Sequence, residues 1–231
     1  MKKLCLLLTL VVAVLFVNAQ DNVVKLGLDG LANGKINLEY ERVIMEHQSA
    51  NIRASIYIPR SYPYGLESNL GYTIVDDRIT GFAINPEYRF YGKKHDAPEG
   101  FYTSVGFNYG QYSLNGDYMH NGALTENKVK LSFLGAGIQF GYQWVFNDMI
   151  TVDWAFFGMR LNRITLSGES STDTPGSIDY IGVRDDILEF QNSYTFLARN
   201  VDVQAGDDYL DISTHTFLPY PTMKLSIGFK F

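Results

Sequence analysis

Alternation of apolar and polar residues with a period of two runs through most of this chain, and this alternation restricts the fold more than any other feature. Such a pattern is typical of β-strands that bury one face. No stretch after residue 19 offers the roughly 18 uninterrupted apolar residues of a transmembrane helix. We therefore predict an all-β chain whose eight strands lie at 23–29, 35–40, 51–58, 81–91, 101–112, 134–146, 150–156 and 223–231.

Alternation alone is compatible with a soluble β-sandwich as well as with a membrane barrel. Most of the segments run about 9–12 residues, which suits a tilted strand that crosses a bilayer, whereas sandwich strands are usually about 5–6 residues long. Aromatic residues make up 14% of the chain and crowd segment ends, as at 88–91 and 144–146. Such clusters are typical of the aromatic girdles of membrane barrels. We predict an eight-stranded antiparallel transmembrane up-and-down barrel, filled by side chains rather than open as a pore.

Residues 1–19 have the layout of a secretory signal peptide. Lys2 and Lys3 precede an apolar run that ends before Ala19. The rival interpretation, an N-terminal membrane anchor, needs an apolar run of about 20 residues, which is longer than this one. Cys5, the sole cysteine, lies at the front of the run, so we expect no lipid attachment and no disulfide. Cleavage after Ala19 leaves residues 20–231 with a formal net charge of −8, since two lysines are removed from a chain of net charge −6.

The C-terminal strand ends on Phe231, and a terminal aromatic residue on such a strand resembles the signal that outer-membrane barrels present to their insertion machinery. We therefore expect the bacterial outer membrane as the location, the lipid bilayer and this machinery as partners, and no further domain. Apart from a short link at 30–34, the connections alternate in length as in such barrels. Short periplasmic turns are predicted at 45–50, 92–100 and 147–149, and long extracellular loops at 59–77, 113–128 and 162–219.

Strand parity makes one local prediction. Phe146 and Ile150 must both face lipid, so residues 147–149 form a three-residue turn, because a two-residue turn would reverse the faces of the next strand. This register sets Gln139 opposite Phe157 and Gly141 opposite Ala155, with room for Phe157 beside the inward glycines. The Gly135–Gly137 pair is then a packing feature, since the strand–turn–helix setting of a nucleotide loop is missing.

The faces predicted to point inward carry five bases and five acids. Unpaired charges in a closed interior would be costly, so we expect a core held by salt bridges; a path for protons or solutes is the alternative. The inward bases are Lys25, Arg53, Arg89, Lys224 and Lys230, and the acids are Asp29, Glu39, Glu41, Glu87 and Asp153.

Catalytic and metal-binding signals are weak, and we predict no catalytic, cofactor-binding or metal-binding residue. His47 and His95 fall in predicted periplasmic turns, and His120 and His215 in outer loops, without the spacing of a metal motif. The stretch 213–215, Ser-Thr-His, would suit a hydrolase at the outer rim, but neither a GxSxG motif nor a catalytic pair of carboxylates accompanies it. The acidic pI of about 5.2 argues against a nucleic-acid partner.

The longest connection, 162–219, is strongly acidic, with ten acids, three bases and a net charge of −7. A structureless loop of this length would be unusual. Apolar residues at helical spacing predict a helix at 185–198, with Asp185 at its N-cap, inside a folded cap over the outer mouth that could meet an extracellular partner. Asp202, Asp207, Asp208 and Asp211 could bind Ca²⁺ through their oxygen atoms, or form a solvated acidic rim.

Several phrases of the chain are similar to a family of uncharacterised outer-membrane β-barrel proteins from Bacteroidetes, classed as a domain of unknown function. The resemblance implies an eight-stranded barrel over most of residues 23–231 and no known activity. We expect a structural or surface-interaction role and no enzyme; the alternatives are a lipid-active or proteolytic barrel enzyme and a transporter of small solutes. The similar phrases are INLEYER (36–42), NPEYRFY (85–91), GAGIQFGYQW (135–144) and PYPTMKLSIGF (219–229).

Overall fold

The computed structural model describes residues 22–31, 34–59, 72–120, 123–193 and 200–231. The predicted signal peptide lies outside these residues. The described part holds nine strands and one long helix. No helix among the described residues combines the length and the apolar character needed to cross a membrane.

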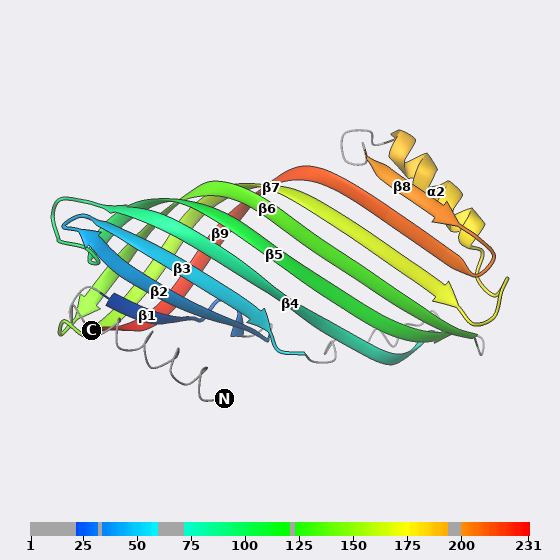
Figure 1. Cartoon of the computed structure of the whole chain (residues 1–231), viewed down its shortest axis with the longest axis horizontal. Helices are drawn as coiled ribbons and strands as arrows, with labels where there is room; N and C mark the ends of the chain where they lie inside the picture. The colour runs from blue at the N-terminus through cyan, green and yellow to red at the C-terminus, as the bar shows by residue number, and fades with distance from the viewer. Residues whose placement is uncertain (1–21, 32–33, 60–71, 121–122, 194–199) are drawn as a thin grey trace, which may run out of the picture.

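Eight strands form a closed antiparallel barrel, as predicted (Figure 1). Each strand pairs with the next one in the order β1 to β7, then β9, and β1 pairs with β9 to close the ring. The ring consists of β1 (Asn22–Gly27), β2 (Lys35–Met45), β3 (Gln48–Tyr57), β4 (Tyr72–Tyr91), β5 (Gly100–His120), β6 (Ala123–Phe146), β7 (Ile150–Thr172) and β9 (Tyr209–Lys230).

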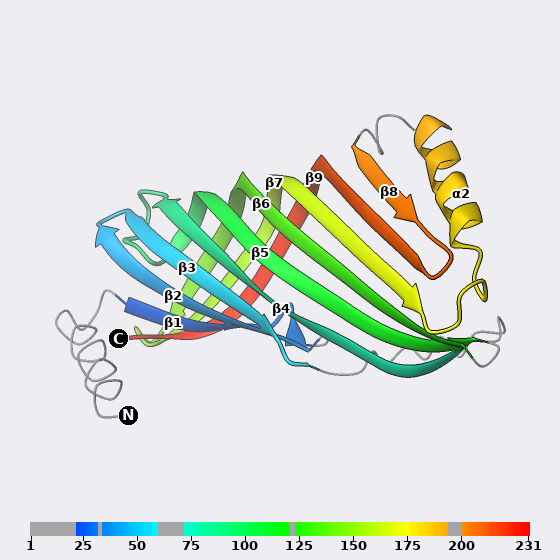
Figure 2. The same ribbon diagram turned by 45° about the vertical axis from the view of Figure 1, so that its right-hand side comes forward.

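The two ends of the barrel differ. At one end, here called the turn end, lie both ends of the described chain and three short connections between β2 and β3, β4 and β5, and β6 and β7. Asn22 and Phe231 exchange two backbone hydrogen bonds there, of 3.1 and 2.9 Å, which complete the closure of the ring. At the opposite end, called the extended end, β4 to β7 and β9 continue well beyond the short strands β1 to β3 (Figure 2).

The strands extend further than the sequence patterns predicted, and the long loops are correspondingly shorter. β4 begins at Tyr72, within the predicted loop 59–77, and β5 and β6 leave only residues 121–122 between them where 113–128 was expected. β7 and β9 take both ends of the predicted loop 162–219 and leave 173–208 as the connection. His120 and His215 therefore lie in strands and not in loops, which corrects the prediction for both.

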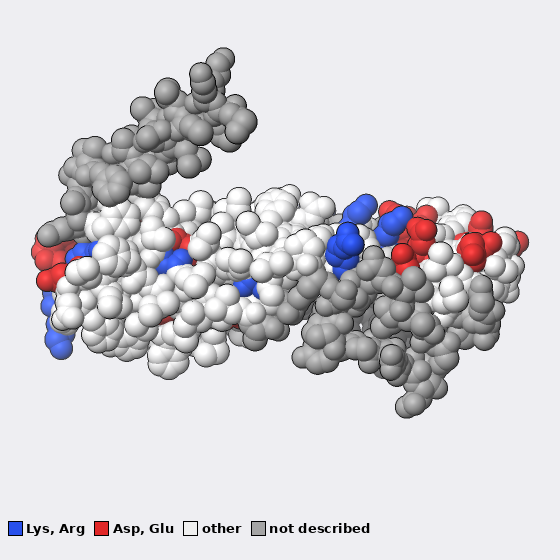
Figure 3. All heavy atoms as spheres, turned by 90° about the horizontal axis from the view of Figure 1, so that it is seen from below, with Lys and Arg blue, Asp and Glu red and all other residues white. Residues whose placement is uncertain are grey.

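Within the barrel, the polarity of the two faces is the reverse of that in a water-soluble protein. Apolar side chains point outward and polar ones inward: Phe107 is 66% exposed, whereas Arg89 is 0% exposed. On the face shown in the space-filling view, most of the barrel surface is uncharged, and charged side chains gather toward the two ends of the molecule (Figure 3). The outward apolar positions of β6 run from Leu134 to Phe146, longer than the about 9–11 residues that a tilted strand needs to cross a bilayer.

Beyond the barrel, this polarity inverts. The β5–β6 pairing runs without a register shift from Gly100–Gln143 to His120–Ala123, so each face of the barrel continues into the projecting part of the sheet. On β5, the outward positions change from Phe107 and Tyr109 to polar residues at 111–117. The inward positions change there from polar to largely apolar residues. The inner face of the projecting sheet carries Ile79, Tyr112, Leu114, Tyr118, Val129, Leu131, Phe133, Ile164, Leu166, Ile212 and Leu218.

The described part of the connection between β7 and β9 is folded, as predicted, but its elements differ from the expectation. It holds helix α2 (Tyr180–Ser193) and strand β8 (Val201–Ala205), which pairs with the outer part of β9. The helix begins five residues before the predicted 185–198. Asp185 is not its cap, because the side chain of Asp179 accepts a 2.9 Å hydrogen bond from the backbone N–H of Gly182.

The β6–β7 turn confirms one register prediction and corrects another. Phe146 pairs with Ile150, so 147–149 is a three-residue connection, and Asn147 and Asp148 adopt positive φ angles of 53° and 56°. A β-bulge follows in β7, because Phe140 pairs with Phe157 and Gln139 with Gly158. Phe157 therefore lies on the outer face, 48% exposed, and the prediction that it fills the interior opposite Gln139 was wrong.

We predict that deletion of Phe231 weakens closure of the barrel, because it removes both backbone hydrogen bonds to Asn22 and shortens the β1–β9 pairing that closes the ring. The full chain is refolded into detergent micelles and run on a gel with and without boiling. A closed barrel changes its mobility when it is boiled, so this change measures closure. Phe231→Leu is the matched control, since it keeps the backbone groups and should fold in micelles. Normal heat-modifiable protein after the deletion would contradict this account of closure.

Candidate functional site

The interior of the barrel contains a network of buried ion pairs in two layers. The layer nearer the turn end joins Lys25 to Glu41 at 2.5 Å and to Asp153 at 2.7 Å. Arg89 also contacts both acids, Asp153 at 2.7 Å and Glu41 at 3.3 Å. The amide oxygen of Gln143 accepts a 2.6 Å hydrogen bond from the Lys25 ammonium. Two cations and two anions thus balance within this layer.

The second layer lies toward the extended end and is organised by Glu87. Its carboxylate contacts the Arg89 guanidinium at 3.3 Å, the Arg160 guanidinium at 3.2 Å and the Lys224 ammonium. Arg160 also donates a 2.6 Å hydrogen bond to the side-chain oxygen of Asn85. Because Arg89 reaches acids in both layers, its guanidinium joins them into one network.

A third set of contacts lies beside this layer, around Glu39 and Arg53. The Glu39 carboxylate accepts hydrogen bonds of 2.5 Å from Ser226 and 3.1 Å from Asn51. Arg53 forms an ion pair with Asp29, and its Nε lies 3.6 Å from Glu39. These contacts link β2, β3 and β9 with the connection that follows β1 across the interior.

Two tyrosines support the network from β4 and β5. Tyr91 donates a 2.6 Å hydrogen bond to Glu41, and Tyr102 a 2.7 Å bond to Asp153. The Arg89 guanidinium lies 4.4 Å from the centre of the Tyr102 ring, a cation–π contact. Gly141 makes room for this ring, since a Cβ there would lie 2.5 Å from its hydroxyl oxygen.

The structure confirms the predicted salt-bridged interior and adds to its members. Of the ten inward charges predicted, nine join these contacts, whereas Lys230 lies half-buried near the turn end. Arg160 was not among the predicted inward residues, because the bulge at Phe157 reverses the parity of β7 after that residue. The glycines at 135 and 137 lie inside β6 and pack against the side chains of Asn162 and Arg160, as the packing interpretation expected.

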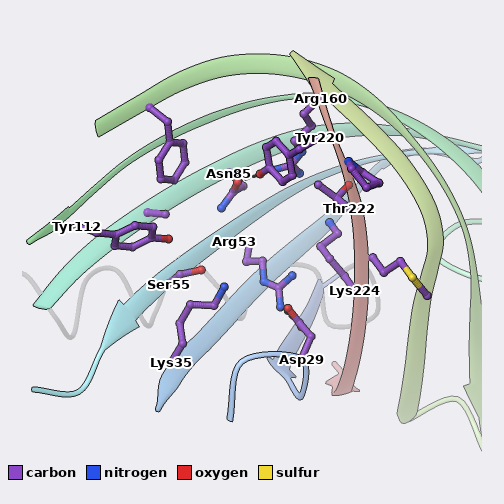
Figure 4. A pocket seen from close by; sticks show the side chains of 14 residues that line it. Asp29, Lys35, Arg53, Ser55, Asn85, Tyr112, Arg160, Tyr220, Thr222 and Lys224 are labelled. Atoms are coloured by element: carbon purple, nitrogen blue, oxygen red, sulfur yellow. Dashed lines mark hydrogen bonds and ion pairs between the residues drawn. The ribbon is translucent and has the colours of Figure 1, made fainter. Parts of the chain in front are cut away.

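A cavity of about 230 Å³ lies next to the second layer, on the side of the extended end (Figure 4). Four basic side chains from different strands line it: Lys35, Arg53, Arg160 and Lys224. Tyr112 and Tyr220 line it from β5 and β9, and Phe133 lines it from β6. The cavity is therefore basic at the barrel and aromatic toward the projecting sheet.

The residues that suggested a hydrolase share one face but are not joined. Asp211, Ser213 and His215 alternate along the outer face of β9, and Asp202 of β8 pairs beside Ser213. Neighbouring positions on one strand face lie roughly 6.6 Å apart. Among the described residues no hydrogen bond joins Ser213 to His215.

The described histidines and acids offer one group with metal-ligand spacing, and it lies at the turn end. Candidate ligand atoms of Glu46, His47 and Asp96, from two neighbouring turns, lie within 4.8 Å of one another. Within the described part of the chain, the four aspartates proposed for Ca²⁺ at 202–211 form no such group.

Comparisons with known proteins add a family and a distant structural likeness. A family profile described as "Protein of unknown function (DUF3575)" matches residues 5–158, more than half of the chain. No curated protein matches the sequence. A solved structure, a major outer membrane protein from Thermus thermophilus, is similar over 93% of this chain and 100% of its own, with 11% identity and a TM-score of 0.39.

We predict that Glu87→Leu destabilises the barrel, because it leaves three cations of the network, Arg89, Arg160 and Lys224, without this carboxylate. Removing one partner from a buried pair costs about 3–5 kcal/mol. Urea denaturation in detergent micelles, followed by tryptophan fluorescence, measures the loss. Glu126→Gln is the control, since Glu126 pairs with Lys128 on the exposed outer face and should change stability little. Equal stability of the two variants would show that the network contributes little to the fold.

Proposed function

We propose that this chain, which belongs to the DUF3575 family of proteins of unknown function, is a non-enzymatic outer-membrane β-barrel that acts through its projecting sheet and cap at the cell surface. In this proposal residues 1–19 are a signal peptide removed on export, and the C-terminal strand ending at Phe231 engages the barrel insertion machinery. The similarity of its strand phrases to Bacteroidetes proteins supports an origin in that group.

The apolar outer belt is the observation that carries the membrane assignment. Exposed aliphatic and aromatic side chains cover the outer face on every strand of the ring, among them Ile52, Phe107, Ile138 and Met223. The charged residues of the same face lie toward the two ends of this belt, as at Arg42 on β2 and Arg163 on β7. An apolar band with polar residues at its ends and a polar interior is typical of outer-membrane barrels. The turn end would then face the periplasm.

The buried network favours a closed barrel rather than a barrel that contains a path for solutes. Arg89 is fully buried and contacts acids on β2, β4 and β7, so side chains from opposite walls meet across the interior. A conducting path would have to break these ion pairs, each of which lies away from water. The structural role predicted for the inward charges fits this arrangement better than transport does.

The surface role rests on the cap formed by residues 173–208. This segment holds eight acids and two bases, a net charge of −6 at the far end of the sheet. Tyr180 anchors it, since it is buried and its hydroxyl lies 3.0 Å from that of Ser170 on β7. A folded, acidic and exposed cap suits a partner with a basic surface. The enzyme alternative has less support, because Ser213 and His215 are not joined.

The orientation can be tested by cysteine labelling, because the only cysteine of the chain, Cys5, lies in the predicted signal peptide. We expect a Glu189→Cys variant, on the exposed side of α2, to react with a bulky membrane-impermeant maleimide in intact cells. An Asp148→Cys variant in the β6–β7 turn should react only after the outer membrane is permeabilised. The reverse pattern, or labelling of neither variant in intact cells, would overturn the proposed position.

The role of the cap can be tested by its replacement. Thr172 donates a 2.9 Å backbone hydrogen bond to Asp208, so β7 and β9 are already close where the cap leaves the sheet. Residues 174–206 can therefore be replaced by a short glycine-rich turn, and we expect the barrel to stay heat-modifiable. We expect a photo-crosslinker at position 183 of the intact chain to capture a surface partner. A photo-crosslinker at position 127 of the shortened chain should capture none. Undiminished partner crosslinking without the cap would move the interaction elsewhere on the barrel.

A further inference from the structure

The inversion of polarity beyond the barrel leaves an apolar inner face next to a basic cavity. Tyr112 and Phe133 line both, with ring centres 5.5 Å apart, and Tyr57 packs edge-on against Tyr112 at 5.0 Å. Leu131 and Leu114 continue the apolar surface from these rings along β6 and β5. The rings thus join the basic cavity to an apolar surface that leads away from the barrel.

Among the side chains that the structure describes, the charges around the cavity do not balance. Lys35, Arg53, Arg160 and Lys224 line it, and the acids that contact these cations are Asp29, Glu39 and Glu87. Four cations and three anions leave one positive charge in excess. No ion pair or hydrogen bond joins the Lys35 ammonium to another described residue, although its side chain points into the cavity (Figure 4).

A single negative charge on a ligand would restore the balance. The planar guanidinium groups of Arg53 and Arg160 suit a carboxylate, which accepts two hydrogen bonds from such a fork. A phosphate monoester carries about −1.5 to −2 charges at neutral pH and would leave an excess of negative charge. The cavity of about 230 Å³ is smaller than the about 300–1,000 Å³ typical of sites that enclose a drug-sized ligand. It therefore suits a head group and the first part of one chain.

We propose that this cavity binds a single-chain amphiphile with a carboxylate head, such as a fatty acid. The carboxylate lies among Lys35, Arg53 and Arg160, and the alkyl chain passes Tyr112 and Phe133 to lie on the inner face of the projecting sheet. This site goes beyond the proposed surface role and does not involve the acidic cap. Replacement of residues 174–206 therefore tests the surface role without removing any residue that lines the cavity.

The test is native mass spectrometry of the full-length barrel, released from a non-ionic detergent in the presence of dodecanoate. We expect one dodecanoate per chain, with dodecanol, acetate and dodecyl phosphate bound at least tenfold more weakly. Lys35→Gln should lower dodecanoate affinity at least tenfold. The matched control is Lys130→Gln, which removes the same charge from the outer face of the projecting sheet and should leave the affinity unchanged.

A second pair of variants tests the path of the chain. Leu131→Asn on the inner face should weaken dodecanoate binding several-fold, and Ser132→Asn on the outer face should not. Heat-modifiable mobility shows that each variant is folded. Equal binding of dodecanol, tighter binding of dodecyl phosphate, unchanged affinity in Lys35→Gln, or a dimer of the barrel that binds no dodecanoate would each overturn the proposal.

Discussion

The interior depends on the ion pairs formed by the guanidinium of Arg89. It is fully buried, and a buried cation is tolerated only when acids and hydrogen-bond acceptors surround it. Asp153 and Glu41 accept hydrogen bonds from its Nη1 on one side, and Glu87 accepts one from its Nη2 on the other. These acids come from β7, β2 and β4, so satisfying one side chain fixes the relative positions of distant walls. The inward glycine of β6 at position 141 follows from the same requirement, since it admits the ring that stacks on the guanidinium.

The barrel itself could be predicted from the sequence because the physical rule involved is local. Alternation in segments such as 134–146 and 223–231 assigns a face to each residue, and the faces alone identify nearly all of the buried charges. The three-residue turn at 147–149 followed from the same parity, since Phe146 and Ile150 both had to lie outside. No long-range information was needed for either result.

The features that escaped prediction are those where either the parity of a strand or the polarity of its two faces changes. A bulge at Phe156–Phe157 places two consecutive aromatic residues outside and thereby turns Arg160 inward. In the projecting sheet the alternation continues, but with apolar residues on the inner face. The pattern of apolar outward residues therefore stops early, and the predicted strand ended at Tyr112, whereas β5 ends at His120. The cavity is invisible in the sequence for a further reason, because Lys35, Arg160 and Tyr220 come together only when the ring closes.

The exchange of polarity between the two faces has a mechanical consequence for the position we propose in the membrane. On β7, Leu161 and Arg163 are successive outward residues, so the boundary between hydrocarbon and water is defined to within one pair of residues on that strand. The neighbouring strands change polarity close to the paired positions, since Arg163 pairs with Leu134 and Leu134 with Tyr109. Vertical sliding in either direction would bring charge into lipid or aromatic surface into water. The polarity of the strands thus determines how deeply the barrel lies in the membrane. The same boundary fixes how far the projecting sheet extends above the lipid.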